Sequence, residues 1–145
     1  MNRRIAICSV FACILLGVAF APAQVGKRAA GMLDPNTATE AELTAVPGLN
    51  TEIAKALIAK RPFLSMTDLN AFLVEQKLTA EQLRTTYGKL FLHLNLNTAA
   101  DAEIQMIPNS GPRVLREFKE YRPYATMAQF RREMNKYWDA AEVAR

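Results

Sequence analysis

Residues 33–73 read LDPNTATEAELTAVPGLNTEIAKALIAKRPFLSMTDLNAFL. Sixty-one positions later, residues 94–134 read LNLNTAADAEIQMIPNSGPRVLREFKEYRPYATMAQFRREM. The two stretches align without a gap, and they share an Asn-Thr-Ala tripeptide, an Arg-Pro dipeptide and most of their apolar positions. Self-similarity at a fixed period is the mark of a duplicated structural unit. The chain therefore contains two copies of one unit.

Each copy is predicted to fold as a helix, a tight turn and a second helix. In the first copy, Thr39 and Glu42 have the spacing of a capping box, which satisfies backbone donors at a helix start. Pro47 and Gly48 end that helix, and apolar residues at helical spacing predict another from Thr51. Further caps are predicted at Ser65, Thr79, Thr126 and Asp139. Such short helices are unstable alone and must pack together, so the sequence predicts an all-α protein.

The turn between the two helices is the most informative segment. It consists of Gly48, Leu49 and Asn50 in the first copy and of Asn109, Ser110 and Gly111 in the second. Glycine and asparagine enter left-handed backbone conformations most cheaply. We therefore expect two left-handed positions around a central residue in each copy. This pattern fits a helix-hairpin-helix turn, and the fold expected is two such units in tandem.

The segment NTATEAELTAVPGLNTEIAKALIAKRPF resembles the helix-hairpin-helix repeat of ComEA-type proteins, which are secreted or membrane-anchored DNA receptors of bacterial competence. The family pattern is roughly Asn-Thr-Ala, an acidic helix, Leu-Pro-Gly-Ile-Gly, an alanine-rich helix and Arg-Pro-Phe. Asn50 stands where the family has its second glycine, and Asn109 and Ser110 depart from the pattern in the second copy. The two-copy arrangement also resembles PsbU-type extrinsic photosystem subunits, which use this fold to bind proteins.

The ComEA resemblance implies sequence-independent binding of double-stranded DNA, beside type IV pilus or type II secretion-like uptake machinery. A tight turn leading into a helix presents backbone amides at the positive end of the helix dipole, which suits a phosphate oxygen. The implied contacts are Gly48, Leu49, Asn50, Thr51 and Lys55 in the first copy, and Asn109, Ser110, Gly111, Arg113 and Arg116 in the second. Such backbone contacts predict affinity that falls steeply with salt. The resemblance also permits a monovalent cation on the turn carbonyls, and no other cofactor is expected.

Two alternatives compete with DNA binding. In the first, the basic residues Arg113, Arg116 and Lys119 pair with Glu117 and Glu120 on a solvated helix face. In the second, the duplicated unit is a protein-interaction or structural module of the cell envelope. Its contacts would be an exposed patch of aromatic side chains, as interfaces use, formed by Tyr121, Tyr124, Tyr137 and Trp138. We favour the packing of these aromatic residues in the core of the second unit.

Catalysis is not expected. The chain holds one histidine, His93, in a segment of alternating apolar character where a half-buried structural role is favoured over that of a general base. For the DNA contact proposed at Lys55, Glu52 lies nearby in the sequence and opposes the lysine's charge. Other features that a catalytic site would need are also missing. The sequence contains no glycine-rich phosphate loop and no metal-ligand spacing.

Residues 1–23 have the composition of a signal peptide. Arg3 and Arg4 precede an apolar run over residues 5–20, and small residues follow up to Ala23. The run is shorter than the roughly 20 residues of a membrane span, so cleavage after Ala23 is preferred over a retained anchor. We therefore expect export to the periplasm or another extracytoplasmic space.

Removal of this segment would change the charge and the thiol chemistry. Both cysteines, Cys8 and Cys13, lie within it, so the mature chain could form neither a disulfide nor a thiolate metal site. The formal charge would fall from +4 to +2, because residues 24–145 hold 16 basic and 14 acidic side chains. A charge this small does not by itself argue for nucleic acid. The predicted divisions are a signal peptide over 1–23, a linker over 24–32, and units over 33–93 and 94–145.

The second copy is expected to differ from the first at its end. With one deletion, Trp138 aligns with Leu78. The helix that begins near Thr79 is predicted to bury Leu83, Tyr87 and Leu90 or Phe91, and the sequence stops before the counterparts of the last three. We expect either a frayed final helix or, preferentially, a longer parent sequence.

Overall fold

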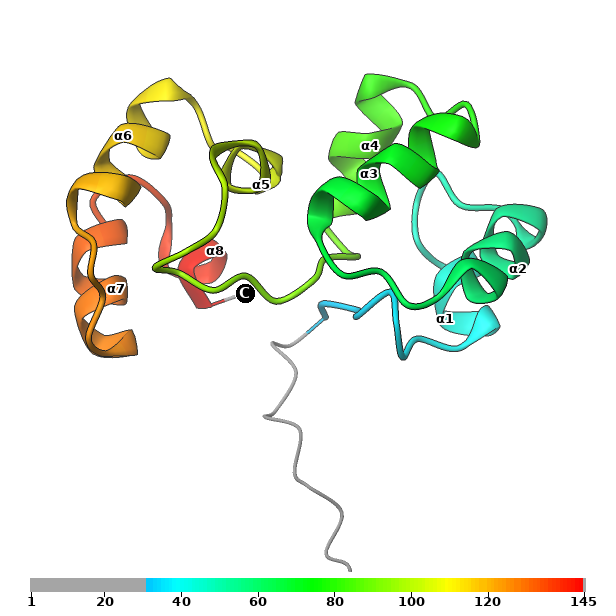
Figure 1. Cartoon of the computed structure of the whole chain (residues 1–145), viewed down its shortest axis with the longest axis horizontal. Coiled ribbons are helices and arrows are strands. Elements are labelled where there is room, and N and C mark those ends of the chain that lie inside the picture. Colours follow the sequence, from blue (N-terminus) through cyan, green and yellow to red (C-terminus); the bar gives the residue numbers. More distant parts are fainter. Residues whose placement is uncertain (1–30, 145) are drawn as a thin grey trace, which may run out of the picture.

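The computed structural model describes residues 31–144, and its helices fall into two sets of four that lie side by side (Figure 1). The first set comprises α1 (Glu40–Thr44), α2 (Thr51–Lys60), α3 (Met66–Glu75) and α4 (Ala80–Tyr87). The second comprises α5 (Asp101–Met106), α6 (Pro112–Glu120), α7 (Met127–Met134) and α8 (Ala140–Ala144). The all-α prediction is confirmed. The predicted signal peptide and most of the predicted linker lie outside the described residues.

The predicted helix starts are confirmed. Thr39 and Glu42 form a capping box in which the Thr39 amide donates to Glu42 Oε2 at 2.8 Å and the Glu42 amide donates to Thr39 Oγ1 at 3.3 Å. The side chains that accept from a backbone amide at the start of α3, α4, α7 and α8 are Ser65, Thr79, Thr126 and Asp139. One expectation was wrong: α4 ends at Tyr87, because the chain turns at Gly88, and Leu90 and Phe91 therefore lie beyond the helix.

Each set of helices surrounds its own hydrophobic core. In the first unit Leu43, Leu57 and Leu69 are fully buried, and in the second Ile104 and Phe118 occupy the corresponding interior. Burial of such side chains is the main favourable term in folding. Among the described residues, no helix is long and apolar enough to cross a bilayer.

The aromatic residues near the C-terminus belong to the second core. Tyr124 and Trp138 are each 6% exposed, and Tyr121 and Tyr137 pack against the same cluster. Phe118 contacts Tyr124 edge to face, with ring centroids 5.6 Å apart. The favoured interpretation of these side chains as core is confirmed, and the alternative of an exposed aromatic patch was wrong.

The repeated Asn-Thr-Ala and Arg-Pro motifs join the two ends of each hairpin. Asn36 Oδ1 accepts from the Phe63 amide at 2.7 Å, and Asn36 Nδ2 donates to the Phe63 carbonyl at 2.8 Å. Arg61 Nε donates to the Pro35 carbonyl at 2.6 Å, and Arg61 has the predicted extended backbone. The second unit repeats these bonds through Asn97, Tyr124, Arg122 and Leu96.

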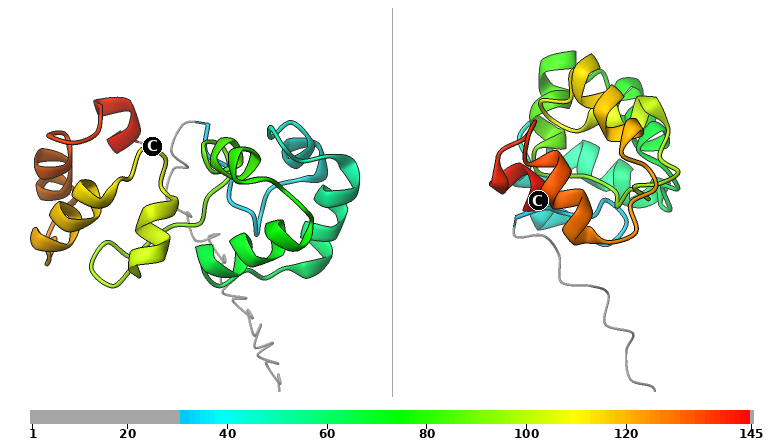
Figure 2. Two further views of the ribbon diagram at one scale, coloured as in Figure 1. Left: turned by 90° about the horizontal axis from the view of Figure 1, so that it is seen from above. Right: turned by 90° about the vertical axis from the view of Figure 1, so that its left-hand side faces the viewer.

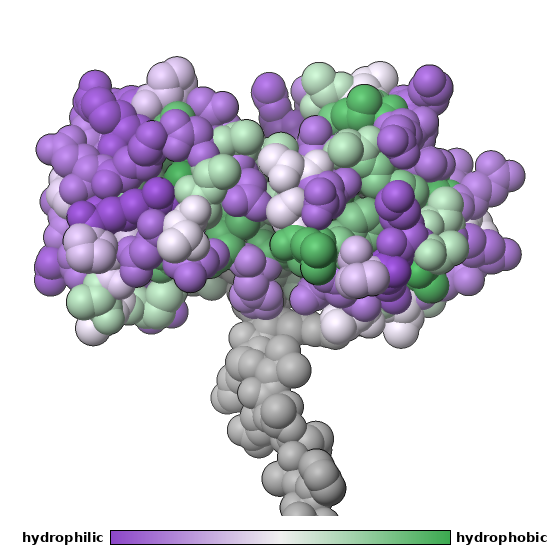
Figure 3. Space-filling model, in the orientation of Figure 1, coloured by the Kyte–Doolittle hydropathy of each residue, from purple (hydrophilic) through white to green (hydrophobic). Residues whose placement is uncertain are grey.

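The two units touch through α3 and α5, where the Met66 amide donates to Glu103 Oε1 at 3.2 Å. Leu33 and Leu90 form an isolated parallel bridge at the end of the first unit, and an extended segment then leads into the second (Figure 2). His93 lies on this segment and is exposed, so the expectation of a half-buried histidine was wrong. Figure 3 shows the second unit as largely hydrophilic on one face, whereas hydrophobic surface gathers on the first.

Candidate nucleic-acid interface

The first hairpin turn is held by Thr86 of α4 and by the buried side chain of Leu49. Gly48 has φ +90°, and a Cβ at this position would lie 2.9 Å from Thr86 Oγ1 on α4. The Leu49 side chain is 7% exposed, and its amide donates to the Val46 carbonyl at 3.1 Å. Thr86 Oγ1 donates to the Pro47 carbonyl at 2.9 Å. The turn is therefore held against the core of the first unit by a buried side chain and a hydrogen bond.

This turn presents backbone donors at the start of α2. Asn50 has an extended backbone, and its Oδ1 accepts from the Ile53 amide at 2.8 Å, so it caps the ten-residue helix. Within residues 31–144 nothing accepts a hydrogen bond from the amides of Gly48, Asn50 or Thr51, and all three residues are exposed. Unpaired amides at the positive end of a helix dipole favour an anion.

The turn geometry corrects two expectations. Only the first position of each turn is left-handed, with φ +90° at Gly48 and +63° at Asn109. The third position is extended in both turns, because Asn50 and Gly111 are helix N-caps, and N-caps adopt extended backbone. The amides of Leu49 and Ser110 are also not free donors. That of Ser110 donates to the Ile107 carbonyl at 3.1 Å, as Leu49 does to Val46.

The second turn has fewer contacts that fix its backbone than the first. Gly111 makes no side-chain cap, and a Cβ there would meet nothing within 4 Å. Pro112 occupies the first turn of α6, as predicted, and brings no amide hydrogen. Among the described residues, no acceptor meets the amides of Asn109, Gly111 and Arg113. Ser110 Oγ is buried and likewise finds no partner in that part of the chain.

The first cation of α2, Lys55, is only loosely paired. Lys55 Nζ lies 3.9 Å from Glu40 Oε1, and the two side chains are 65% and 44% exposed. An exposed pair at this distance contributes little, at most about 1 kcal/mol. Glu52, which lies near Lys55 in the sequence, forms no salt bridge with it among the described residues. Lys55 therefore remains available to an incoming phosphate.

On α6, one of the expected ion pairs forms and the others do not. Arg116 pairs with Glu117 at 2.8 Å, whereas Lys119 reaches Asp101 on α5 at 2.8 Å. Glu117 also accepts from the Tyr137 hydroxyl at 2.8 Å, and the bonds from Arg116 and Tyr137 lower the pKa of its carboxyl group. The α6 face is therefore partly self-neutralised, because Arg116 and Lys119 already have acidic partners.

Arg113 is the cation of α6 that forms no salt bridge with the described residues, although its charge helps to lower the pKa of the Glu117 carboxyl group. Its guanidinium lies over the Tyr137 ring, 5.5 Å from the centroid. A cation over an aromatic face keeps its charge and its outer donors. Arg113 is exposed and follows the second turn directly, so its position at the start of α6 suits contact with a phosphate.

A second arginine near this turn comes from the first unit. Arg84, on α4, lines a cavity of about 520 Å³ together with Asn109, Ser110 and Gly111. The opposite face of α4 carries Thr86, which contacts the first turn. Helix α4 thus separates the two hairpin turns. Sequence reasoning missed Arg84, because no local pattern links it to a turn about 25 residues further along the chain.

The described residues hold no group of three His, Cys, Asp or Glu side chains placed to bind a metal ion. The cation site that the resemblance permits on the turn carbonyls stays a prediction.

Comparison with known proteins supports the geometry of the first unit. Residues 29–86 match the family described as "Helix-hairpin-helix motif". No curated protein and no solved structure matched the chain significantly. The matched residues include α1, the Gly48 turn, α2, α3 and nearly all of α4. The first of the two repeated units is therefore a helix-hairpin-helix motif, and the second repeats its helices and turn.

Proposed function

We propose that this protein binds double-stranded DNA through the phosphate backbone, without sequence preference, as a non-catalytic exported protein of the ComEA type. The observation that carries the proposal is the first turn, where the exposed residues Gly48, Asn50 and Thr51 have amides that find no acceptor within residues 31–144. A backbone phosphate oxygen is the acceptor that such a turn fits. Export rests on the signal-like sequence of residues 1–23, and a role in DNA uptake rests on the resemblance to ComEA-type proteins.

The positions of the basic side chains support a small number of phosphate contacts, shared between the two hairpin turns. Lys55 lies one turn beyond the first hairpin, and Arg113 and Arg84 flank the second. If these three side chains contact phosphates, the logarithm of the binding constant should fall with the logarithm of salt concentration at a slope of about −3. A protein with a formal charge near neutrality gains little from long-range attraction, so binding should be weak at physiological salt.

The test is fluorescence anisotropy of a labelled random duplex with residues 24–145, titrated at low and then moderate salt. Thr51→Pro removes one proposed donor at the first helical position, where proline is tolerated. The matched control is Ala140→Pro at the first position of α8. A hydrogen bond to a charged group is worth about 1.5–3 kcal/mol, so Thr51→Pro should weaken binding about tenfold or more. Absence of binding at low salt would overturn the proposal.

A further inference from the structure

Positive charge is concentrated in one stretch of the described chain, which covers α6, α7 and the residues that follow each of them. Residues 112–137 hold seven basic and three acidic side chains, a formal charge of +4. Residues 31–111 hold six basic and nine acidic side chains, a formal charge of −3. An asymmetry of this kind within a small protein indicates an anionic partner for the basic part. The nearly neutral total charge conceals it.

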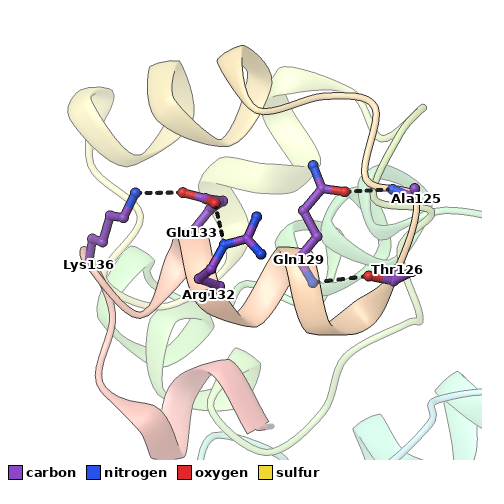
Figure 4. Close-up of polar contacts among 6 residues, drawn as sticks. All are labelled: Ala125, Thr126, Gln129, Arg132, Glu133 and Lys136. Carbon is purple, nitrogen blue, oxygen red and sulfur yellow. Dashed lines mark hydrogen bonds and ion pairs between the residues drawn. The ribbon is translucent and has the colours of Figure 1, made fainter.

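Two of the three carboxylates in this stretch lie beneath the cations with which they pair. The Glu117 and Glu133 side chains are only 14% and 12% exposed, whereas their partners Arg116 and Arg132 are 68% and 70% exposed. Lys136, the second partner of Glu133, is 52% exposed (Figure 4). The charges that face the solvent here are therefore mostly positive, although each carboxylate is paired.

Aromatic rings hold two of these cations in place. The Arg113 guanidinium lies 5.5 Å from the centroid of the Tyr137 ring, and Lys136 Nζ lies 5.1 Å from that of Tyr121. A cation over an aromatic face keeps its charge and its outer donors. Because these side chains are already ordered, they lose less conformational freedom when they bind a ligand.

The contacts join the cations into one surface. The Tyr137 hydroxyl donates to Glu117 at 2.8 Å, and the ring of the same tyrosine lies under Arg113. Lys136 precedes Tyr137 in the chain and reaches Glu133, the partner of Arg132. We call this group the α6–α7 basic surface, and its cations are Arg113, Arg116, Arg132 and Lys136.

The other charged residues of residues 112–137 do not add to this surface. Lys119 pairs with Asp101 of α5, and Arg122 donates to the backbone carbonyls of Leu96 and Ala99. Glu120 is exposed on α6 and offsets part of the positive charge.

The α6–α7 basic surface is continuous with the second hairpin turn. Arg113 follows that turn directly, and the amides of Asn109 and Gly111 find no acceptor among the described residues. A DNA duplex carries one negative charge per about 1.7 Å of its axis, so its backbone offers further phosphates beside any that a turn binds. A duplex held at the second turn can therefore also contact this surface.

An anionic membrane fits the surface less well. A helix that lies on a membrane buries exposed apolar side chains at the lipid boundary. The large hydrophobic side chains exposed in the described part of the chain are Leu64, Val74 and Met127. The first two belong to the first unit, and Met127 begins α7, whereas Lys136 lies beyond the other end of that helix.

We propose that the α6–α7 basic surface is a further DNA contact, in which Arg132 and Lys136 bind backbone phosphates beyond the second hairpin turn. The second unit then contributes more to DNA binding than its turn alone would. This inference rests on the proposed DNA binding and extends its contact area to α7.

The first test is the anisotropy titration of a labelled random duplex with the double variant Arg132→Gln, Lys136→Gln. Glutamine removes the charge and keeps an amide that can donate to Glu133. Each phosphate contact steepens the salt slope by about 0.9, so the parent chain should show a slope of about −4.5, against about −3 for the turns alone. The double variant should return the slope to about −3 and weaken binding at low salt about tenfold or more.

A substitution of opposite effect separates binding from damage to the fold. Glu133→Gln removes the carboxylate beneath Arg132 and Lys136, so it should strengthen DNA binding about threefold. A variant that only disturbed α7 would bind DNA more weakly. Circular dichroism verifies that each variant is folded.

The matched control is the double variant Lys60→Gln, Lys89→Gln, which removes the same charge from the first unit. Both lysines are exposed and form no salt bridge with the described residues, so the slope should stay at the parent value. Equal losses in the two double variants would overturn the inference, because total charge alone would then explain the effect. A parent slope of about −3 that neither double variant changes would also overturn it and would leave DNA binding by the turns intact.

Sedimentation with vesicles of phosphatidylcholine and phosphatidylserine distinguishes the other anionic partner. Vesicle binding that Arg132→Gln, Lys136→Gln abolishes, with DNA binding unchanged, would assign the surface to a membrane and overturn the inference. Absence of DNA binding by the parent chain would overturn both this inference and the proposed function.

Discussion

Gly48 and Thr86 approach so closely that no side chain fits between them. A Cβ on residue 48 would stand 2.9 Å from Thr86 Oγ1, and that hydroxyl is itself fixed by its hydrogen bond to the Pro47 carbonyl. The backbone at Gly48 is also left-handed, with φ +90°. Two independent constraints thus demand glycine at the turn that presents the unpaired amides.

Gly48→Ala should therefore destabilise the protein by about 1–3 kcal/mol, from backbone strain and from displacement of Thr86. Gly111→Ala is the matched control. Gly111 has φ −88°, and a Cβ there meets nothing within 4 Å, so this change should cost less than about 1 kcal/mol, from the poorer N-cap that alanine makes. Urea unfolding followed by circular dichroism measures both. Equal losses in the two variants would mean that the second turn is as constrained as the first.

Asn36→Ala should cost about 2 kcal/mol or more. The substitution leaves the amide and the carbonyl of Phe63 without their partner, and unsatisfied groups in a partly buried site are expensive. Asn135→Ala is the control, because Asn135 is exposed and its side chain makes no hydrogen bond with the described residues. The same urea experiment compares them. Similar midpoints would show that the Asn36 bonds contribute little net stability.

The local features of this fold were predictable from sequence, and the long-range ones were not. Helix caps such as Thr39 with Glu42 depend on residues three apart, so their spacing is visible in the sequence. The bond from Asn36 to Phe63 spans 27 positions. In the repeat, Asn36 returns as Asn97 and Phe63 is replaced by Tyr124, and no local rule predicted that the two positions would meet. The position of Arg84 beside the second turn was not predictable for the same reason, since it results from the packing of the two units.

Charge partners on α6 also depended on tertiary structure. Helical spacing predicted that Glu117 and Glu120 would neutralise the basic residues, yet Lys119 pairs with Asp101 of α5. Packing of α5 against α6 brings that carboxylate closer than the helix's own neighbours.

The structure distinguishes two arginines that sequence treated alike. Arg116 forms a salt bridge with Glu117, whereas Arg113 forms none with the described residues. If α6 contacts DNA, Arg113→Ala should weaken binding and reduce the salt slope by about 1. Arg116→Ala should change both less, because its charge is already offset. Anisotropy titrations at three salt concentrations compare the two variants. A larger loss of affinity for Arg116→Ala would show that DNA contacts α6 further from the turn than Arg113.

Glu133, on α7, joins Arg132 of the same helix to Lys136 in the turn that follows, and this gives the second unit a dependence on pH. Its carboxylate accepts from Arg132 Nε at 2.8 Å and from Lys136 Nζ at 2.5 Å (Figure 4). The bonds from Lys136 and Arg132 lower the pKa of the Glu133 carboxyl group from its ordinary value of 4.5. Because the folded pKa lies below the unfolded one, the stability this group contributes is complete above the unfolded pKa and is lost as pH falls through the folded pKa.

Glu133→Gln should therefore destabilise the protein at pH 7 and lose most of that effect below about pH 4. Glu75→Gln is the control, because Glu75 is exposed on α3 and has no ion-pair partner among the described residues. Urea unfolding at pH 7, 5 and 3 measures the difference between each variant and the parent chain. A Glu133→Gln deficit that stays constant from pH 7 to pH 3 would mean that the ionised carboxylate does not stabilise α7. The loss would then reflect changed packing around a side chain that is 9% exposed.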